Sequence, residues 1–264
     1  MDALINHFRM SYTDVGQGLP VVLIHGFPLN REIWAPQTEA LTNKYRLITP
    51  DLRGHGDSEA TPGPYTMDLL ADDINGLLDA VHIQQRVILG GLSMGGYVAM
   101  AFARRHPERL AGLFLTATHA DADTPEGQDG RRKAIAAAEQ ACSSQPAVDS
   151  MLPKLFAPQT YTEKPALVEN VRLIVGKTSL TGVINAQLGM LERSDSHDTL
   201  RNLEVPGLML YGDQDQIIPE EAAIKTADGF ADCTMGAIKG AGHLLNMERP
   251  DEFNRSLLDW LERF

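Results

Sequence analysis

The sequence predicts an α/β fold, in which helices flank a mostly parallel β-sheet and one helical segment is inserted into the chain. Short apolar runs alternate with helical patterns from about residue 19 onward, stop alternating between about 121 and 196, and resume near 208. Such alternation is typical of parallel strands connected by crossover helices. At 264 residues the chain can bury one large core, so two independent domains are not required.

The composition excludes several classes of ligand. Hydrophobic residues make up 43% and charged residues 22%, which is ordinary for a folded globular chain. The formal net charge is −12. Nucleic acids and anionic membranes attract an excess of Lys and Arg, so neither is an expected partner. We expect a small ligand that is not strongly anionic.

Cysteines and the first residues bear on the cellular compartment. Cys142 and Cys233 are the only cysteines, and their spacing does not match a metal site. A disulfide framework is therefore not expected, although a single bridge stays open. Polar residues interrupt positions 1–20, at Asp2, His7, Arg9 and Asp14. Because no apolar run remains for a signal peptide or membrane helix, we expect a cytoplasmic protein.

The first elements form the edge and centre of the expected sheet. Residues 4–12 have an extended pattern followed by a turn at 14–16, which indicates an antiparallel hairpin at the sheet edge. The runs 20–24 and 45–49 are short and apolar, and turn residues follow each of them. Both are typical of buried central strands.

A helix over 66–81 follows, with Thr66 as a plausible N-cap. Its apolar residues recur at helical spacing, at Leu70, Ile74, Leu77, Leu78 and Val81. Apolar runs at 86–89 and 110–115 predict the next two strands.

Residues 121–196 predict an inserted helical cap, because the strand pattern is replaced by helical segments. Helix breakers divide it at Pro125, Pro146, Pro153, Pro158 and Pro165. Residues 1–120 and 197–264 then form the core domain, with strands expected at 208–211 and 233–239. An amphipathic helix ends the chain, with apolar residues at Phe253, Leu257, Leu261 and Phe264.

Ser93 is the candidate nucleophile. It lies in Gly91-Leu92-Ser93-Met94-Gly95, which matches G-x-S-x-G, a pattern that places a serine on a strained turn from strand to helix. A serine hydroxyl is a poor nucleophile by itself, so it needs a base within hydrogen-bond reach and an acid that orients the base.

His243 is the candidate base, because it follows the last strand in a glycine-rich loop, where its ring can reach the sheet edge. The acid should follow an earlier strand, and the choice is between two neighbouring aspartates. We favour Asp215 and interpret Asp213 as a turn residue that bonds backbone groups. Asp121, after the 110–115 strand, remains an alternative.

An acyl transfer also needs N–H donors for the oxyanion of the tetrahedral intermediate. The backbone of Met94, directly after the nucleophile, can supply one, and that of Phe27, on the loop after the first central strand, can supply the second. His25, two residues earlier, is interpreted as a structural residue.

Five segments together resemble the α/β-hydrolase superfamily, and the resemblance covers nearly the whole chain. They are His25-Gly26-Phe27-Pro28, 51–58, Gly91-Leu92-Ser93-Met94-Gly95-Gly96, Gly212 with Asp215, and Gly242-His243. The resemblance implies a mostly parallel sheet of eight strands. It also implies that His55 and Ser58 shape a loop and do not act in catalysis.

Within that superfamily the chain looks most like carboxylesterases, enol-lactonases and cofactor-free haloperoxidase-like perhydrolases. Ser93 differs from the aspartate nucleophile of haloalkane dehalogenases and epoxide hydrolases, which speaks against their reactions. The resulting hypothesis is a serine esterase that cleaves a small, mostly apolar carboxylic ester by a Ser93, Asp215 and His243 triad. A lactonase or perhydrolase with the same triad is an alternative, as is a non-enzymatic small-molecule receptor.

No metal-binding or phosphate-loop motif is present, so the sequence implies neither a metal nor another cofactor. Apolar residues of the cap could roof an acyl pocket over Ser93 or could pack the interior of the cap. They are Met151, Leu152, Leu155, Phe156, Val183, Ile184, Leu188 and Leu191.

Overall fold

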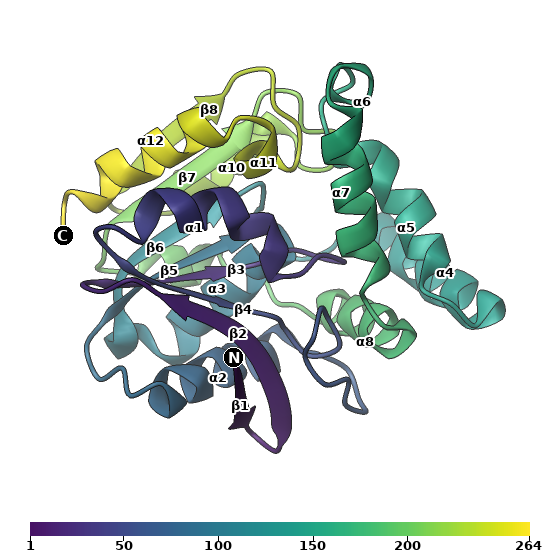
Figure 1. The fold of residues 1–264 in the computed structure, drawn as a ribbon, viewed down its shortest axis with the longest axis horizontal. Coiled ribbons are helices and arrows are strands. Elements are labelled where there is room, and N and C mark those ends of the chain that lie inside the picture. Colours follow the sequence, from purple (N-terminus) through teal and green to yellow (C-terminus); the bar gives the residue numbers. More distant parts are fainter.

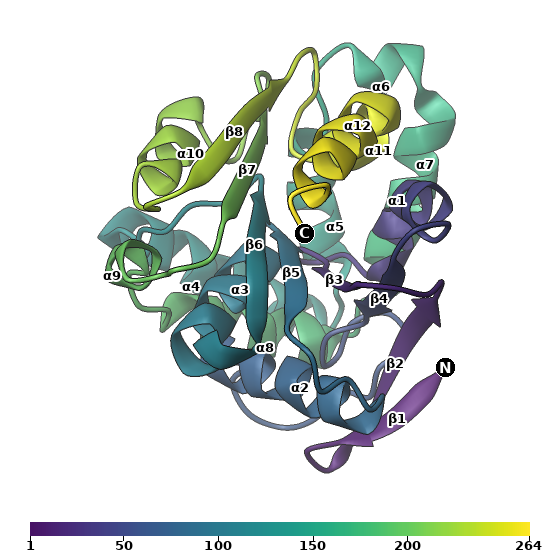
Figure 2. The ribbon, with the colours of Figure 1, turned by 90° about the vertical axis from the view of Figure 1, so that its left-hand side faces the viewer.

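The computed structural model describes residues 1–264 and contains one sheet of eight strands in the order β1-β2-β4-β3-β5-β6-β7-β8 (Figures 1 and 2). The strands are β1 (Asp2–Ile5), β2 (Phe8–Val15), β3 (Pro20–Ile24), β4 (Arg46–Pro50), β5 (Val87–Leu92), β6 (Leu110–Thr116), β7 (Gly207–Gly212) and β8 (Cys233–Ile238). All neighbouring strands from β4 to β8 in this order are parallel, whereas β1 and β2 pair antiparallel. The predicted fold class is confirmed.

The edge hairpin is present, but its turn was predicted at the wrong place. The chain reverses at Asn6 and His7, which have φ angles of 44° and 69°. Two consecutive positive φ angles are typical of the tight turns that match the twist of a hairpin. Asp14 and Val15, which were predicted to turn, still pair with β4 as the last residues of β2.

Each central strand contributes to two hydrophobic layers, one on each face of the sheet. In β3, Val22 and Ile24 pack in one layer, while Val21 and Leu23 pack in the other. Side chains of a strand alternate between faces, so a strand buried on both sides is apolar throughout. This explains the uninterrupted apolar runs in the sequence.

Helices cover both layers (Figure 2). On one face lie α2 (Met67–Ala80), α3 (Met94–Arg105), α9 (His197–Arg201) and α10 (Glu220–Ala227); on the other lie α1 (Ala35–Leu41), α11 (Leu245–Glu248) and α12 (Pro250–Leu261). Phe264 lies beyond the end of α12 and is 44% exposed, so its predicted place on the buried face of that helix was wrong.

The segment between β6 and α9 is helical and lies to one side of the sheet (Figure 1). Its α-helices are α4 (Pro125–Ala141), α5 (Gln145–Met151), α6 (Thr160–Glu163), α7 (Pro165–Gly176) and α8 (Leu180–Leu191). We refer to residues 121–196, which contain them, as the cap. None of the helices in the structure combines the length and apolar character needed to span a membrane.

Helix α2 begins where the sequence indicated. The Thr66 hydroxyl accepts a hydrogen bond from the backbone N–H of Leu69 at 3.1 Å, which satisfies one of the free donors of the first turn. We therefore expect Thr66→Ala to lower the free energy of unfolding by about 1 kcal/mol. Urea unfolding measures this change, and Thr181→Ala, at an exposed position in α8, is the control. Equal stability of the two variants would contradict the capping role.

Candidate functional site

Ser93 lies at a sharp turn between β5 and α3. Its backbone has φ 56° and ψ −116°, a combination that is strained for any residue other than glycine. The turn is held because Ser93 N–H donates to Thr116 O at 3.0 Å and the Thr118 hydroxyl donates to Ser93 O at 2.9 Å. A Cβ atom on Gly95 would lie 2.3 Å from Ile24 O, so only glycine fits there. Ser93 is partly exposed, whereas its neighbours Leu92 and Met94 are buried.

Asp215 and His243 lie in contact, although 28 residues separate them in the chain. Asp215 Oδ2 lies 2.8 Å from His243 Nδ1, and both side chains are 1% exposed. The second carboxylate oxygen, Oδ1, accepts the backbone N–H groups of Ile217 at 2.8 Å and Ile218 at 3.1 Å. The carboxylate is therefore fixed on one side, and its other oxygen orients the imidazole.

The remaining ring nitrogen of His243, Nε2, is buried and has no hydrogen-bond partner. The structure thus brings Asp215 and His243 together but forms no hydrogen bond between His243 and Ser93. In enzymes without substrate such bonds are often long or poorly aligned.

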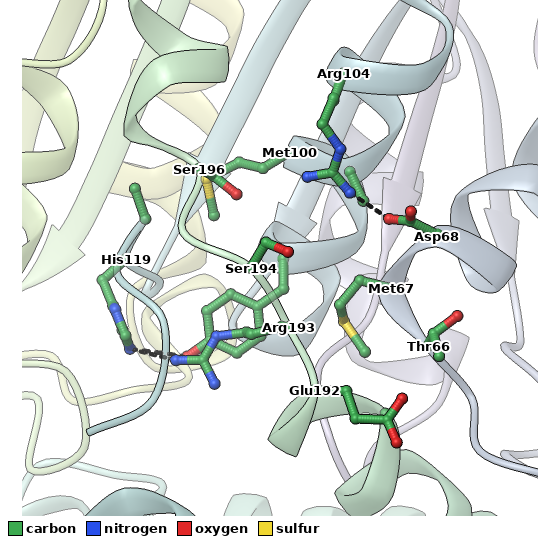
Figure 3. A pocket seen from close by; sticks show the side chains of 14 residues that line it. Thr66, Met67, Asp68, Met100, Arg104, His119, Glu192, Arg193, Ser194 and Ser196 are labelled. Carbon is green, nitrogen blue, oxygen red and sulfur yellow. Dashed lines mark hydrogen bonds and ion pairs between the residues drawn. The ribbon is translucent and has the colours of Figure 1, made fainter. Parts of the chain in front are cut away.

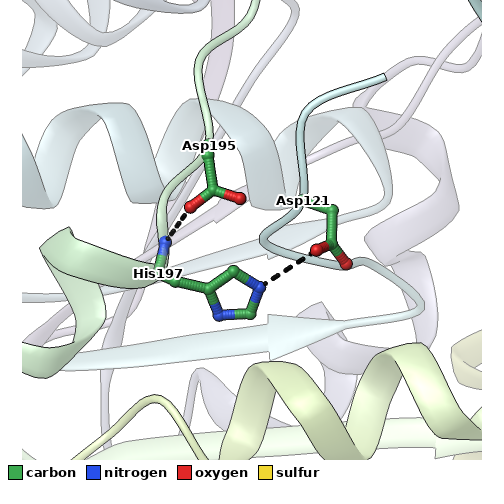
Figure 4. Close-up of side chains that lie close together, drawn as sticks. All are labelled: Asp121, Asp195 and His197. Atoms are coloured by element: carbon green, nitrogen blue, oxygen red, sulfur yellow. Dashed lines mark hydrogen bonds and ion pairs between the residues drawn. The ribbon is translucent and has the colours of Figure 1, made fainter. Parts of the chain in front are cut away.

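The two alternative aspartates have other partners. Asp213 Oδ1 accepts the Gly240 N–H at 2.7 Å, which ties the loop after β7 to the loop that carries His243. Asp121 binds Lys225 and accepts a hydrogen bond from His197 Nε2 at 3.2 Å (Figure 4). Neither carboxylate bonds His243.

Asp195 also lies in the cluster of Figure 4, where it accepts the backbone N–H of His197 at 2.9 Å. Asp121, Asp195 and His197 are near enough to one another to suggest a metal site. The Lys225 ammonium already pairs with the Asp121 carboxylate, so the arrangement of these three side chains does not require a metal ion.

The two expected oxyanion donors belong to the loop after β3 and to the first turn of α3. Met94 is the first residue of α3, and the N–H of a first helical residue has no partner within its helix. Phe27 N–H makes no backbone hydrogen bond. The loop that carries Phe27 packs against the Ser93 turn, because a Cβ atom on Gly26 would lie 3.1 Å from Ser93 Cβ.

His25 has a structural environment. Its Nε2 accepts the Leu52 N–H at 3.0 Å, and its Nδ1 lies 2.8 Å from Gly26 O, so the neutral ring links two loops. Burial lowers its pKa to about 4. In the 51–58 loop, the Ser58 hydroxyl donates to Asp51 O at 2.7 Å, and His55 Nδ1 contacts Arg53 O at 2.8 Å.

A cavity of about 190 Å³ between α2, α3 and the end of α8 is lined by polar groups that bind one another (Figure 3). His119 Nε2 lies 3.0 Å from the Tyr97 hydroxyl and 3.4 Å from Arg193 Nη2. Arg193 is buried, stacks over the Tyr97 ring and pairs with Asp123 at 2.5 Å. The Asp123–Arg193 pair joins the first residues of the cap to the segment that follows its last helix, α8.

The apolar residues of the cap have two kinds of environment. Leu155, Phe156 and Val183 are fully or almost fully buried in the two hydrophobic layers, which fits core packing. The other five are partly exposed.

Glu248 is a residue that the sequence reasoning missed. It is 1% exposed in the short helix after His243, and its carboxylate accepts a hydrogen bond from Gly242 N–H. A charged residue at the end of the otherwise uncharged run Leu245-Asn246-Met247 was the available signal.

Three histidines make stability depend on pH. Burial lowers the pKa of His25 to about 4, of His55 to about 3 and of His119 to about 4, from an ordinary value of 6.5. Between pH 6.5 and these values the unfolded chain binds protons that the folded chain does not, so folding is destabilised as the pH falls.

Each such histidine adds a slope of about 1.4 kcal/mol per pH unit where only the unfolded state is protonated. His119→Gln can still bond Tyr97. We expect it to reduce the slope of the unfolding free energy against pH, between pH 4.5 and 6, by about 1.4 kcal/mol per pH unit, which corresponds to one proton. Urea titrations over this range measure it. An unchanged slope would show that His119 does not stay neutral.

Comparisons with known proteins agree with the fold described above. A family model described as alpha/beta hydrolase fold matches residues 20–250. A protein of Synechocystis sp. described as a putative non-heme chloroperoxidase is 31% identical over 95% of this chain and 94% of its own length.

Two solved structures are similar over the whole fold. A thermophilic esterase from Thermogutta terrifontis with bound malate has a TM-score of 0.95 and 38% identity, over 100% of this chain and 98% of its own. The enol-lactonase from Burkholderia xenovorans LB400 has a TM-score of 0.92 and 28% identity, over 99% of this chain and 100% of its own. Because the alpha/beta hydrolase family model matches residues 20–250 and the fold agrees, the chain belongs to the α/β-hydrolase superfamily.

Proposed function

We propose that this protein is a serine esterase that cleaves a small, mostly apolar carboxylic ester through an acyl-enzyme intermediate. The observation that carries the proposal is the Asp215–His243 pair, which leaves His243 Nε2 without a partner. Ser93 supplies the nucleophile on its strained turn, at the same edge of the parallel sheet. Similarity to an esterase and an enol-lactonase supports ester chemistry.

The mechanism follows from the roles of the atoms. Ser93 Oγ attacks the ester carbonyl while His243 Nε2 takes its proton, and Asp215 stabilises the imidazolium that forms. The imidazolium then donates the proton to the leaving alcohol. Water, deprotonated by the same histidine, attacks the acyl-enzyme; the second tetrahedral intermediate then releases the carboxylic acid, and the imidazolium returns the proton to Ser93 Oγ.

The tetrahedral intermediates carry a negative oxygen that the N–H groups of Phe27 and Met94 stabilise. One such donor contributes about 3 to 4 kcal/mol to lowering the barrier. Since both donors belong to the backbone, their position depends on the loop after β3 and the first turn of α3.

A lactonase is the second candidate, because the enol-lactonase structure matches over the whole of its own chain. A lactone is a cyclic ester, so the same steps open its ring. A panel of p-nitrophenyl esters and lactones distinguishes the two functions by kcat/KM. A preference for lactones would replace the esterase assignment but keep the triad.

We expect Ser93→Ala to abolish ester turnover and to leave the fold intact, because it removes only the attacking hydroxyl from a partly exposed turn. Turnover of p-nitrophenyl acetate and a thermal melt test this. Covalent labelling of the unmodified protein at Ser93 by a fluorophosphonate separates an enzyme from a receptor, since a receptor has no activated serine. Near-normal turnover in the variant would exclude the proposed nucleophile.

The two neighbouring aspartates form a matched pair of variants. Asp215→Asn should reduce kcat by about 10⁴-fold, because an amide favours the wrong tautomer of His243. Asp213→Asn should have little effect, since its Oδ1 can still accept the Gly240 N–H. Measurement of kcat on one activated ester, with thermal melts for both variants, compares them. If Asp213→Asn is the impaired variant, the acid has been wrongly assigned.

A further inference from the structure

Glu248 contacts the histidine loop and the cap at the same time. Its Oε2 accepts the Gly242 N–H at 2.5 Å, directly before His243. Its Oε1 accepts two hydrogen bonds from the cap, from the Ala157 N–H at 2.9 Å and the Thr160 hydroxyl at 2.6 Å. A buried carboxylate with three donors is compensated for its loss of water.

Other contacts follow the same path between the histidine loop and the cap. Leu244 N–H donates to Leu155 O at 2.9 Å, and Gln159 Nε2 donates to Gly240 O at 3.2 Å. The backbones also pack closely, because a Cβ atom on Gly242 would lie 2.4 Å from Ala157 N. Cap residues 155–160 therefore form one wall of the loop that presents His243.

The loop that carries Asp215 contacts the same wall. Gln216 Nε2 donates to Phe156 O at 3.0 Å. One short segment of the cap thus contacts both loops of the Asp215–His243 pair, and Glu248 is the only charged side chain that bonds the segment to the histidine loop.

We propose that Glu248 is a positioning residue, which holds the His243 loop against cap residues 155–160 and so keeps the imidazole aligned for proton transfer. This inference rests on the proposed serine-esterase function. Glu248 acts through Gly242 and is not proposed to contact the substrate, so its loss should affect the chemical step more than substrate binding.

Glu248→Gln tests the link without changing the size of the side chain. The amide oxygen can still accept the two cap donors, but the amide nitrogen then faces the Gly242 N–H, so two donors oppose each other. Thr160→Val is the matched control, because it removes a cap-side hydrogen bond of Glu248 and leaves the Gly242 contact.

We expect Glu248→Gln to lower kcat by about 10- to 100-fold with KM within about threefold, since small misplacements of a catalytic group have effects of this size. Thr160→Val should keep kcat within about threefold, even if its melting temperature falls as much as that of Glu248→Gln. In proton NMR, the downfield signal of the proton between His243 Nδ1 and Asp215 should shift or broaden in Glu248→Gln only.

Equal kcat in the two variants, or an unchanged NMR signal in Glu248→Gln, would overturn the proposal. If Glu248→Gln does not fold, Glu248→Asp replaces it, because a side chain one methylene shorter cannot reach Gly242 and Ala157 together. A kcat equal to that of Thr160→Val would again overturn the proposal. Failure of the serine-esterase function is recognised separately, by the absence of ester turnover and of fluorophosphonate labelling in the unmodified protein, or by turnover that persists in Ser93→Ala.

Discussion

Parallel pairing of the strands β3, β5, β6, β7 and β8 determines where the candidate site can form in this protein. The carboxyl ends of parallel strands meet at one edge, so the loops that follow them are neighbours however far apart they are in sequence. The Ser93 turn follows β5, the Asp215 loop follows β7 and the His243 loop follows β8. A site built in this way requires each loop to be held individually, because the sheet fixes only its starting point.

Hydrogen bonds from backbone N–H groups to carboxylates help to hold the Asp215 and His243 loops. Asp215 accepts two N–H groups from its own loop, and Asp213 accepts the N–H of Gly240 in the next loop. Glu248 accepts N–H groups from Gly242 and Ala157. Hydrogen bonds to charged acceptors are stronger than those between neutral groups, and they are directional. Buried carboxylates can therefore position a loop that has few side-chain contacts of its own.

The sequence predicted those features that depend on local pattern. The apolar runs of the central strands, the Thr66 cap of α2 and the strained turn at Ser93 all have signatures within a few residues. The hairpin turn was misplaced because Gly16 is a stronger sequence signal than Asn6 and His7, although the latter pair reverses the chain. The contacts of Glu248 could not be predicted, because they join segments 91 and 88 residues apart and depend on how the cap packs.

The position of Glu248 changes how the insertion between β6 and β7 should be understood. Arg193 pairs with Asp123, so the two ends of the insertion lie close together. The gap that the insertion spans between β6 and β7 is therefore short. On that basis alone, the residues between could vary without disturbing the core, since lengthening a loop adds little to the entropy of closing it. The contacts of Leu155 and Ala157 with the histidine loop limit this freedom. A change in the segment 155–160 should therefore act on the loop that carries His243, the proposed base.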